Sequence, residues 1–340
     1  MREFSRFFMK RHWRLHALLC MAKATKTHAR RSVFLCLLST LVLAAIVFVT
    51  GCASSGTSGN NTGSPGGNGG TGSGGSNPSP ANKSAKRGIA YDLASPADMA
   101  ALAPGVSWWY NWSPSPNASV PSDYRTQYNM DFYPMLWNGT FNSANVVAFL
   151  KANPNIKYIL VLNEPNITSQ ADVTPQHAAE IWPQYEAVAQ QTGVQIVGPA
   201  MTWGTMSGYE DPIAWLDAFY SAYRSANNGN DPEIDYLAFH WYDYGLSDQL
   251  DRLGKYNKSF WVTEFANWHS QDDGAQIDTL AKQEAQMTDM VATCESRVDV
   301  FRYAWFTGRI SPDPHYTSLL AADGQLTGLG QLYITLPYSQ

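Results

Sequence analysis

The chain has 340 residues and a formal charge of −5, which is unevenly distributed. Residues 1–85 hold ten Lys and Arg and one acidic residue, whereas residues 86–340 hold 13 Lys and Arg and 27 Asp and Glu. The acidic part lacks the clustered positive charge that nucleic acids and anionic lipids require, so we exclude both as its partners and expect a neutral one.

The first 52 residues predict export to a membrane. Residues 2–31 are basic and residues 32–50 carry no charge, which is the pattern of a signal sequence or membrane anchor. The apolar stretch ends in Val49-Thr-Gly-Cys52, which resembles the bacterial lipobox. We therefore expect a lipoprotein, lipidated on Cys52 and exposed to the periplasm or the cell surface. An uncleaved signal anchor is the alternative.

A linker follows over residues 53–85. It consists almost entirely of Gly, Ser, Asn, Thr and Pro and has no apolar periodicity, which predicts a disordered tether. A random coil of this length spans roughly 30 Å, enough to hold residues 86–340 just clear of a membrane surface.

Residues 86–340 alternate β-favouring runs with amphipathic segments. Alternation of eight strands with helices is typical of the α/β class and of a single (β/α)8 TIM barrel. Pro134 counts against a central strand in the third run, because proline cannot donate to the ladder. We expect strands at 87–92, 106–112, 131–137, 158–162, 194–198, 234–240, 260–263 and 298–306. We expect helices at 96–102, 143–152, 246–257, 275–295 and after the capped Thr174-Pro175 and Asp211-Pro212, then a turn at Asp323-Gly324 and an apolar run at 329–336.

Two glutamates, Glu164 and Glu264, each close a mostly apolar strand and lie 100 residues apart. In a barrel of this kind, chemistry lies at the carboxyl ends of the strands. Strand alternation predicts that Glu264 points the same way as Val262, and Glu164 the same way as Leu162, into the mouth of the barrel. Either residue alone could be a salt-bridged strand end. Matching positions on two strands favour a carboxylate pair, the minimum equipment for cleaving a glycosidic bond.

Aromatic side chains supply a second signal, since eleven of the twelve tryptophans lie in residues 86–340. Flat, rigid rings suit the C–H faces of sugars, and several occur at or just beyond strand carboxyl ends. Core packing is the alternative for each. The rings expected to bind substrate are Trp112, Trp137, Trp203, Trp241 and Trp305, with Tyr242 and Tyr303 beside them.

His240 lies in the inward register of the sixth strand, so we expect it near the glutamates, bonded to Glu264 or to substrate. A buried histidine with a structural partner is the alternative. No pair of histidines has metal-ligand spacing, and no Gly-rich turn joins a strand to a helix. We therefore expect no metal and no cofactor.

Asn163-Glu164-Pro165 and Trp261-Val-Thr-Glu264 resemble the clan A glycoside hydrolases. Within that clan the chain resembles family 128, small single-domain endo-β-1,3-glucanases, over residues 87–336. Further motifs that carry this resemblance are Trp109-Tyr-Asn-Trp112, Gly198-Pro-Ala200, Asp235-Tyr-Leu-Ala-Phe-His-Trp-Tyr242 and Tyr303-Ala-Trp305. The resemblance implies that Glu164 is the acid/base, that Glu264 is the nucleophile, and that Asn163 contacts the 2-hydroxyl of the sugar being cleaved.

These observations predict a monomeric, retaining endo-glucanase acting on β-1,3-glucan, and the linkage rests on the resemblance alone. One alternative is a retaining hydrolase of another β-glycan, such as cellulose or mannan. A second is a surface glycan-binding barrel without turnover. The presence of both glutamates argues against the second, because a barrel without activity is free to lose either.

Overall fold

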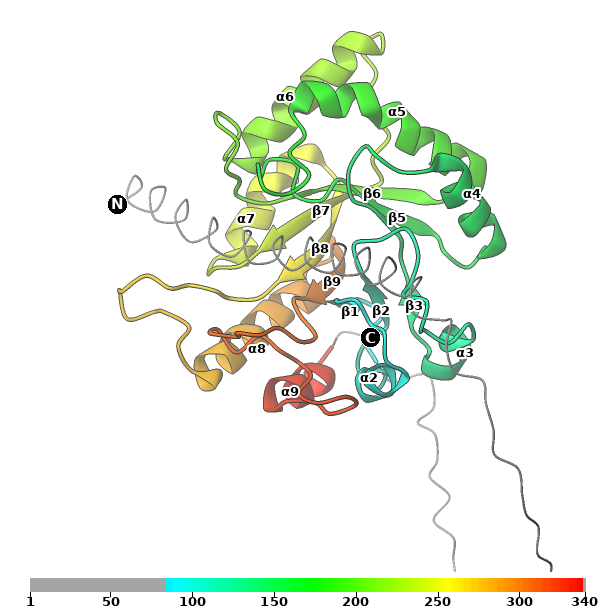
Figure 1. Ribbon diagram of the computed structural model, residues 1–340. Coiled ribbons are helices and arrows are strands. Elements are labelled where there is room, and N and C mark those ends of the chain that lie inside the picture. Colours follow the sequence, from blue (N-terminus) through cyan, green and yellow to red (C-terminus); the bar gives the residue numbers. More distant parts are fainter. Residues whose placement is uncertain (1–82, 339–340) are drawn as a thin grey trace, which may run out of the picture. The chain divides into compact units, whose positions relative to one another are not determined.

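The computed structural model describes residues 83–338, drawn in colour in Figure 1. The predicted leader, Cys52 and the linker up to residue 82 lie outside the described residues. No helix between residues 83 and 338 combines the length and apolar character needed to cross a bilayer.

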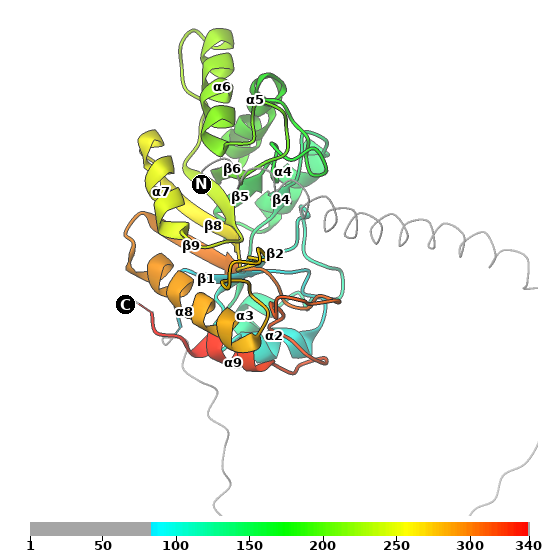
Figure 2. The ribbon, with the colours of Figure 1, turned by 90° about the vertical axis from the view of Figure 1, so that its left-hand side faces the viewer.

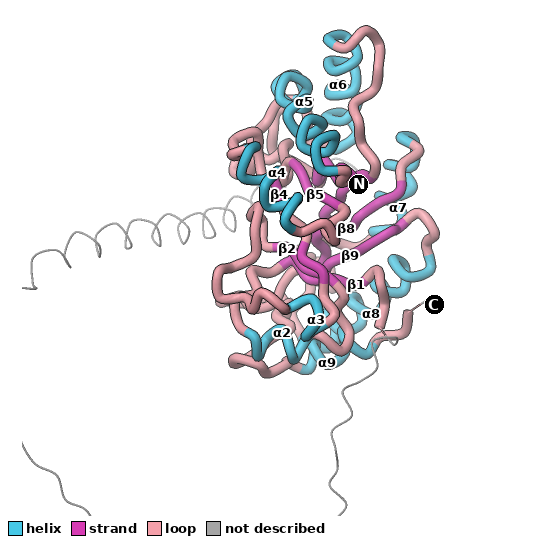
Figure 3. The backbone as a smooth tube through the Cα atoms, turned by 90° about the vertical axis from the view of Figure 1, so that its right-hand side faces the viewer, coloured by secondary structure: helices cyan, strands magenta, loops and turns pink. Residues whose placement is uncertain are grey.

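The described chain is an α/β domain built on one parallel sheet, with the strand order β3-β2-β1-β9-β8-β7-β6-β5-β4. The strands are β1 (Arg87–Ala90), β2 (Trp108–Tyr110), β3 (Asp131–Phe132), β4 (Met135–Leu136), β5 (Tyr158–Val161), β6 (Gln195–Met201), β7 (Tyr236–Trp241), β8 (Ser259–Phe265) and β9 (Val300–Trp305). Seven of the eight predicted runs overlap one strand each. Views a quarter turn away from Figure 1 show the strands inside and the helices around them (Figure 2, Figure 3).

The predicted strand at 131–137 is wrong as a single strand. It is divided into β3 and β4, which form the two ends of the sheet order. Pro134 lies at the break and has no N–H to donate to a ladder. Since only Tyr133 and Pro134 separate the two edge strands in the chain, the sheet must curl until its edges approach one another, as in a TIM barrel.

Helices follow most of the strands. They are α2 (Pro96–Leu102), α3 (Tyr124–Tyr128), α4 (Ser143–Ala152), α5 (Pro175–Thr192), α6 (Pro212–Ala226), α7 (Leu246–Leu253), η1 (Gly254–Tyr256), α8 (Leu280–Ser296) and α9 (Gly328–Thr335). The predicted caps are confirmed, because Thr174 and Asp211 accept backbone amides of the first turn and are each followed by Pro. Helix α3 was not predicted. Helix α8 begins at Leu280 rather than 275, because Thr279 is its N-cap.

Aromatic rings fill the interior of the curled sheet below the strand carboxyl ends. Trp261 lies 5.1 Å from Trp108 and 5.3 Å from Tyr133 between ring centroids, and the guanidinium of Arg302 lies 5.3 Å from its ring. Gly88 makes room for this packing, since a Cβ there would lie 2.2 Å from the Trp108 ring. The filled interior leaves side chains at the carboxyl ends of the strands to form the site.

Candidate active site

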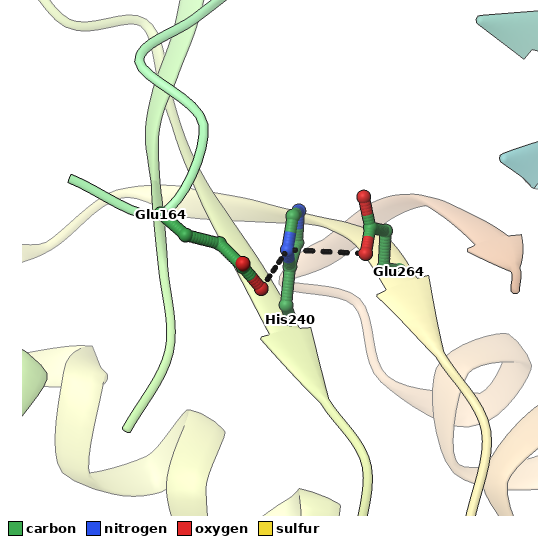
Figure 4. A group of neighbouring side chains, drawn as sticks. All are labelled: Glu164, His240 and Glu264. Atoms are coloured by element: carbon green, nitrogen blue, oxygen red, sulfur yellow. Dashed lines mark hydrogen bonds and ion pairs between the residues drawn. The ribbon is translucent and has the colours of Figure 1, made fainter. Parts of the chain in front are cut away.

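Three charged or titratable side chains meet at the carboxyl ends of the strands (Figure 4). Glu164 follows β5, His240 lies on β7 and Glu264 on β8. His240 Nδ1 lies 2.9 Å from Glu164 Oε1 and 3.4 Å from Glu264 Oε2. One carboxylate oxygen of each glutamate and a ring nitrogen of His240 all lie within 4.8 Å of one another. All three are buried, with exposures of 3, 0 and 5 % respectively. The structure thus brings the two predicted glutamates together on either side of His240 (Figure 4).

Glu264 reaches the site through an irregularity in β8. Val262 is in register with Phe239 of β7, whereas Glu264 is in register with His240, so one residue of β8, Thr263, is left without a counterpart. Side chains in register on parallel neighbours lie on the same face of a sheet. Glu264 therefore faces the same side as His240 and the opposite side from Val262. The prediction that Glu264 points the same way as Val262 is wrong, because this bulge reverses the alternation.

Glu164 has a left-handed backbone conformation, which residues other than glycine rarely adopt. Among the described non-glycine residues, eight have positive φ, and four of those are Asn or Asp, which tolerate this region. Three of the other four are Trp112 (φ 58°) and Glu164 (47°), both at the site, and Leu162 (53°), two residues before Glu164. Each such residue costs roughly 1–3 kcal/mol. Left-handed backbone around Leu162 also means that strand alternation does not determine where Glu164 points.

Glu264 is surrounded by hydrogen-bond donors. The Tyr110 hydroxyl donates to Oε1 over 2.7 Å, the Trp112 indole N–H donates to Oε1 over 2.8 Å, and the Tyr242 hydroxyl donates to Oε2. Burial and the nearby Glu264 raise the pKa of Tyr110 and Tyr242 well above the usual value, so both hydroxyls keep their protons. An ionised carboxylate only accepts hydrogen bonds, so these three donors suit Glu264 as an anion.

Glu164 has a different environment. Burial raises its pKa, the hydrogen bond and charge of His240 oppose that effect, and the charge of Glu264 adds to it, leaving the pKa above the usual value. Burial lowers the pKa of His240, but Glu264 and then Glu164 raise it, with a net increase. Burial and the charge of Glu264 therefore favour the protonated form of Glu164.

Aromatic rings line the Glu264 side of the site. Phe306 lies 5.9 Å from Trp112 and 5.7 Å from Tyr242 between ring centroids, and Trp268 stacks on Tyr242 at 4.3 Å with an interplanar angle of 28°. Trp112 and Tyr242 were predicted, whereas Tyr110, Phe306 and Trp268 were missed. Tyr110 could have been found because it lies two residues before Trp112, whereas alternation along β8 and β9 assigns no direction to Trp268 and Phe306, which follow these strands.

Three predicted substrate-binding residues face the helices instead of the glutamates. Two of them, Trp241 of β7 and Trp305 of β9, are in register with Phe265 of β8. Trp241 and Phe265 come one residue after His240 and Glu264, respectively. Their side chains therefore lie on the outer face of the sheet. Trp305 is fully buried and donates to the Thr317 carbonyl over 2.8 Å. Trp241 stacks on Phe239 at 5.8 Å. These two predictions are wrong because position along a strand was considered without its pleat.

Tyr303 is the third such correction. It is in register with Val262, and its hydroxyl bonds to Glu295 of α8 and accepts from Arg87 Nε over 2.9 Å. Its side chain is fully buried between β9 and the helix layer. Tyr303 is a structural residue that anchors α8 to the sheet.

Asn163 lies beside Glu164 with 3 % exposure. Its amide N–H donates to the Trp137 carbonyl over 2.9 Å, and its Nδ2 donates to Gln170 over 3.4 Å. Its buried Oδ1 has no hydrogen-bond partner within residues 83–338. Trp203 follows β6, where its indole N–H donates to Gln249 over 3.2 Å and Arg252 covers its ring at 5.2 Å. Asn163 therefore offers the site an acceptor, whereas Trp203 is held by α7.

Glu164, His240 and Glu264 are also, among the described residues, the group of potential metal ligands close enough to share an ion. Their atoms are engaged with one another and with the Tyr110, Trp112 and Tyr242 donors.

The class of the protein follows from this geometry. Two buried carboxyl groups in different protonation environments, at the carboxyl ends of parallel strands, are the apparatus of glycosidic bond cleavage. The family model described as "Glycosyl hydrolase catalytic core" matches residues 88–333. The protein is a glycoside hydrolase.

Two solved structures narrow the family. The family 128 subgroup II endo-β-1,3-glucanase of Pseudomonas viridiflava is 63 % identical, with a TM-score of 0.75, over 76 % of this chain and 100 % of that chain. The subgroup II endo-β-1,3-glucanase of Sorangium cellulosum is 34 % identical, with a TM-score of 0.64, over 75 % of this chain and 100 % of that one. The chain belongs to glycoside hydrolase family 128.

A curated relative is more distant. Alkali-sensitive linkage protein 1 of Schizosaccharomyces pombe is 26 % identical over 265 residues, which cover 74 % of this chain and 45 % of that protein. The match therefore spans less than half the length of this curated relative.

Proposed function

We propose that the protein is a retaining glycoside hydrolase that cleaves internal β-1,3-glucosidic bonds of β-glucan. The observation that carries this proposal is the short gap between the two glutamates, whose nearest oxygens lie within 4.8 Å. Retaining enzymes hold their carboxyl groups about 5–5.5 Å apart, whereas inverting enzymes need about 6.5–9.5 Å to admit a water molecule. The gap favours direct attack by one glutamate on the anomeric carbon.

The two environments assign the roles. Glu264, held as an anion by three donors, attacks the anomeric carbon, while Glu164 gives its proton to the departing glycosidic oxygen. Formation of the covalent glycosyl ester removes the charge of Glu264, and with it one of the effects that raise the pKa of Glu164. Glu164 then takes a proton from the water that hydrolyses the ester.

The substrate class is supported by the relative that is 63 % identical and bears the name endo-β-1,3-glucanase. Within the site, the unpartnered Oδ1 of Asn163 lies on the residue next to Glu164 and suits a sugar hydroxyl. We propose that it accepts from the 2-hydroxyl of the sugar being cleaved. The rings of Trp112, Phe306 and Trp268 supply apolar surface for sugar C–H faces.

The test is to incubate the full chain with laminarin, curdlan, cellulose and mannan and to measure reducing ends. We expect release from laminarin and curdlan, with an early fall in laminarin viscosity that marks internal cleavage. Hydrolysis confined to cellulose or mannan would assign a different β-glycan. Binding of laminarin without any hydrolysis would instead identify a glycan-binding barrel.

We also propose that the protein is exported and tethered to a membrane through a lipid on Cys52. The support is the basic and then apolar leader that ends in Val49-Thr-Gly-Cys52. The test is Cys52→Ala in a bacterial host. Release of the variant from the membrane fraction supports lipidation, and continued attachment through an uncleaved leader would refute it.

A further inference from the structure

The pairing of β7 and β8 continues beyond the ends of both strands. The Ala266 amide donates to the Trp241 carbonyl over 3.2 Å, and the Trp268 amide donates to the Tyr242 carbonyl over 2.8 Å. The Trp268 ring then stacks on Tyr242, whose hydroxyl donates to Glu264. The ring of Trp268 is therefore one contact removed from a residue that bonds Glu264.

The next residue, His269, joins the two loops that follow these strands. Its Nδ1 lies 2.8 Å from Asp243 Oδ1, and its Nε2 lies 3.0 Å from Asp273 Oδ2. The His269 side chain is only 9 % exposed. Both ring nitrogens therefore face carboxylate oxygens, and the ring links Asp243 to Asp273. We call this group the histidine clamp; it consists of Asp243, His269 and Asp273.

The long loop between β8 and α8 is organised around this clamp. The Ile277 amide donates to the His269 carbonyl over 2.7 Å, and the Ala275 amide donates to Asp273 Oδ1 over 2.8 Å. The Ala275 amide and His269 hold the pKa of Asp273 below its usual value, so its carboxylate stays charged. On the other side, the Tyr244 hydroxyl donates to the Ala275 carbonyl over 2.7 Å. In Figure 1 this loop extends from the sheet between β8 and α8.

We propose that His269 is a positioning residue: the histidine clamp holds Trp268 stacked on Tyr242 and so fixes the aromatic side of the glucan site. This inference rests on the proposed function and adds a residue that neither touches Glu164 or Glu264 nor enters the reaction. Phe306 and His315 also pack on the Trp268 ring, at 5.5 and 6.5 Å between centroids, so loss of the clamp loosens the ring in its stack without releasing it fully. The effect falls on substrate binding rather than on the chemical step.

The experiment measures kcat and KM of the full chain on laminarin. Loss of one aromatic contact corresponds to about a five- to ten-fold change, so His269→Ala should raise KM by about that factor, with kcat changed less than about two-fold. Asp273→Ala should raise KM in the same direction. Asp273→Asn should restore it only in part, since its amide oxygen still accepts from the Ala275 amide but an NH2 group replaces the oxygen that faces His269 Nε2. His177→Ala is the matched control, because His177 pairs with Glu180 on the exposed face of α5 and should leave KM unchanged.

A double-mutant cycle separates positioning from general destabilisation. If His269 acts through Trp268, the double variant Trp268→Ala/His269→Ala has the KM of Trp268→Ala alone. Additive losses, or a KM of His269→Ala equal to that of the wild type, would overturn the inference. Should His269→Ala fail to fold, Asp273→Ala in the Trp268→Ala background decides the same question, because the Asp273 side chain is 48 % exposed.

A binding measurement separates failure of the histidine clamp from failure of the proposed function. Calorimetric binding of laminarihexaose is measured on the wild type and on His269→Ala. A wild type that binds but does not hydrolyse counts against the hydrolase proposal, and weaker binding by His269→Ala then still supports the clamp. A wild type that neither binds nor hydrolyses the glucan overturns both.

Discussion

The surroundings of Glu264 and of Glu164 differ although both side chains lie next to the ring of His240. Glu264 accepts from Tyr110, Trp112 and Tyr242, three donors that come from β2, the residues after it and the end of β7. Glu164 has His240 as its partner and otherwise lies in a desolvated position. One chemical group thus has two environments, one that suits an anion and one that favours a proton.

The fold gives Glu164 and Glu264 different surroundings, although the two residues are chemically identical. Donors from β2, from the residues after it and from the end of β7 reach Glu264 because the bulge at Thr263 turns it toward the interior. Glu164 has a left-handed backbone conformation and lies beside His240. The difference between the two glutamates depends on backbone irregularity as much as on residue type. The surroundings of each glutamate can be tested separately.

Glu264→Gln removes the proposed nucleophile and should have the largest effect. The amide keeps the size of the side chain but does not attack the anomeric carbon, so we expect kcat on laminarin to fall by about four orders of magnitude or more. Circular dichroism and laminarihexaose binding should remain close to those of the wild type. Retention of most of the activity would exclude Glu264 as the nucleophile.

Glu164→Gln removes the proposed acid and should cost about 10²–10⁴-fold on laminarin. An aryl laminarioside whose leaving group departs without protonation should lose much less in its bond-breaking step. Comparison of the two substrates in pre-steady-state assays measures this selectivity. Equal losses in that step would remove the distinction between the two glutamates.

Tyr242→Phe and Tyr110→Phe each delete one donor to Glu264. A hydrogen bond to a charged group contributes about 1.5–3 kcal/mol, so each change should lower kcat/KM by about ten- to a hundred-fold. Tyr185→Phe is the matched control, because the buried Tyr185 hydroxyl has no hydrogen-bond partner within the described chain. If all three variants behaved alike, the donors would have no special role at Glu264.

His240→Asn should shift the pH profile of kcat/KM. It should not abolish turnover, because His240 is neither the proposed acid nor the proposed nucleophile. The hydrogen bond and charge of His240 lower the pKa of Glu164, so their removal raises that pKa further. Glu164 must be protonated to act as the acid, and the alkaline limb of kcat/KM should therefore shift to higher pH. A shift to lower pH would show that another group controls this limb.

Much of this arrangement was predictable from local pattern. The apolar runs before Glu164 and Glu264 identify strand ends, and Thr174 and Asp211 followed by Pro identify two helix starts, because these features depend on neighbouring residues only. The proximity of the two glutamates followed from the rule that barrel strands present their carboxyl ends on one face.

The direction of individual side chains was not predictable in the same way. Trp241, Tyr303 and Trp305 lie at the correct ends of their strands but on the outer face. A one-residue bulge reverses every later side chain, and no local signal in the residues around Thr263 announces it. Trp268 and Phe306 lie just past strand ends, where periodicity no longer assigns a direction.

We expect the two glutamates to act on the same anomeric carbon, because their oxygens lie within 4.8 Å and inverting enzymes need about 6.5–9.5 Å between carboxyl groups. Proton NMR during early hydrolysis of laminarihexaose tests it directly, because the first anomer released reports the stereochemistry. Release of the β-anomer first, followed by slow mutarotation, is the expected result. Release of the α-anomer first would establish inversion and contradict the nucleophilic role of Glu264.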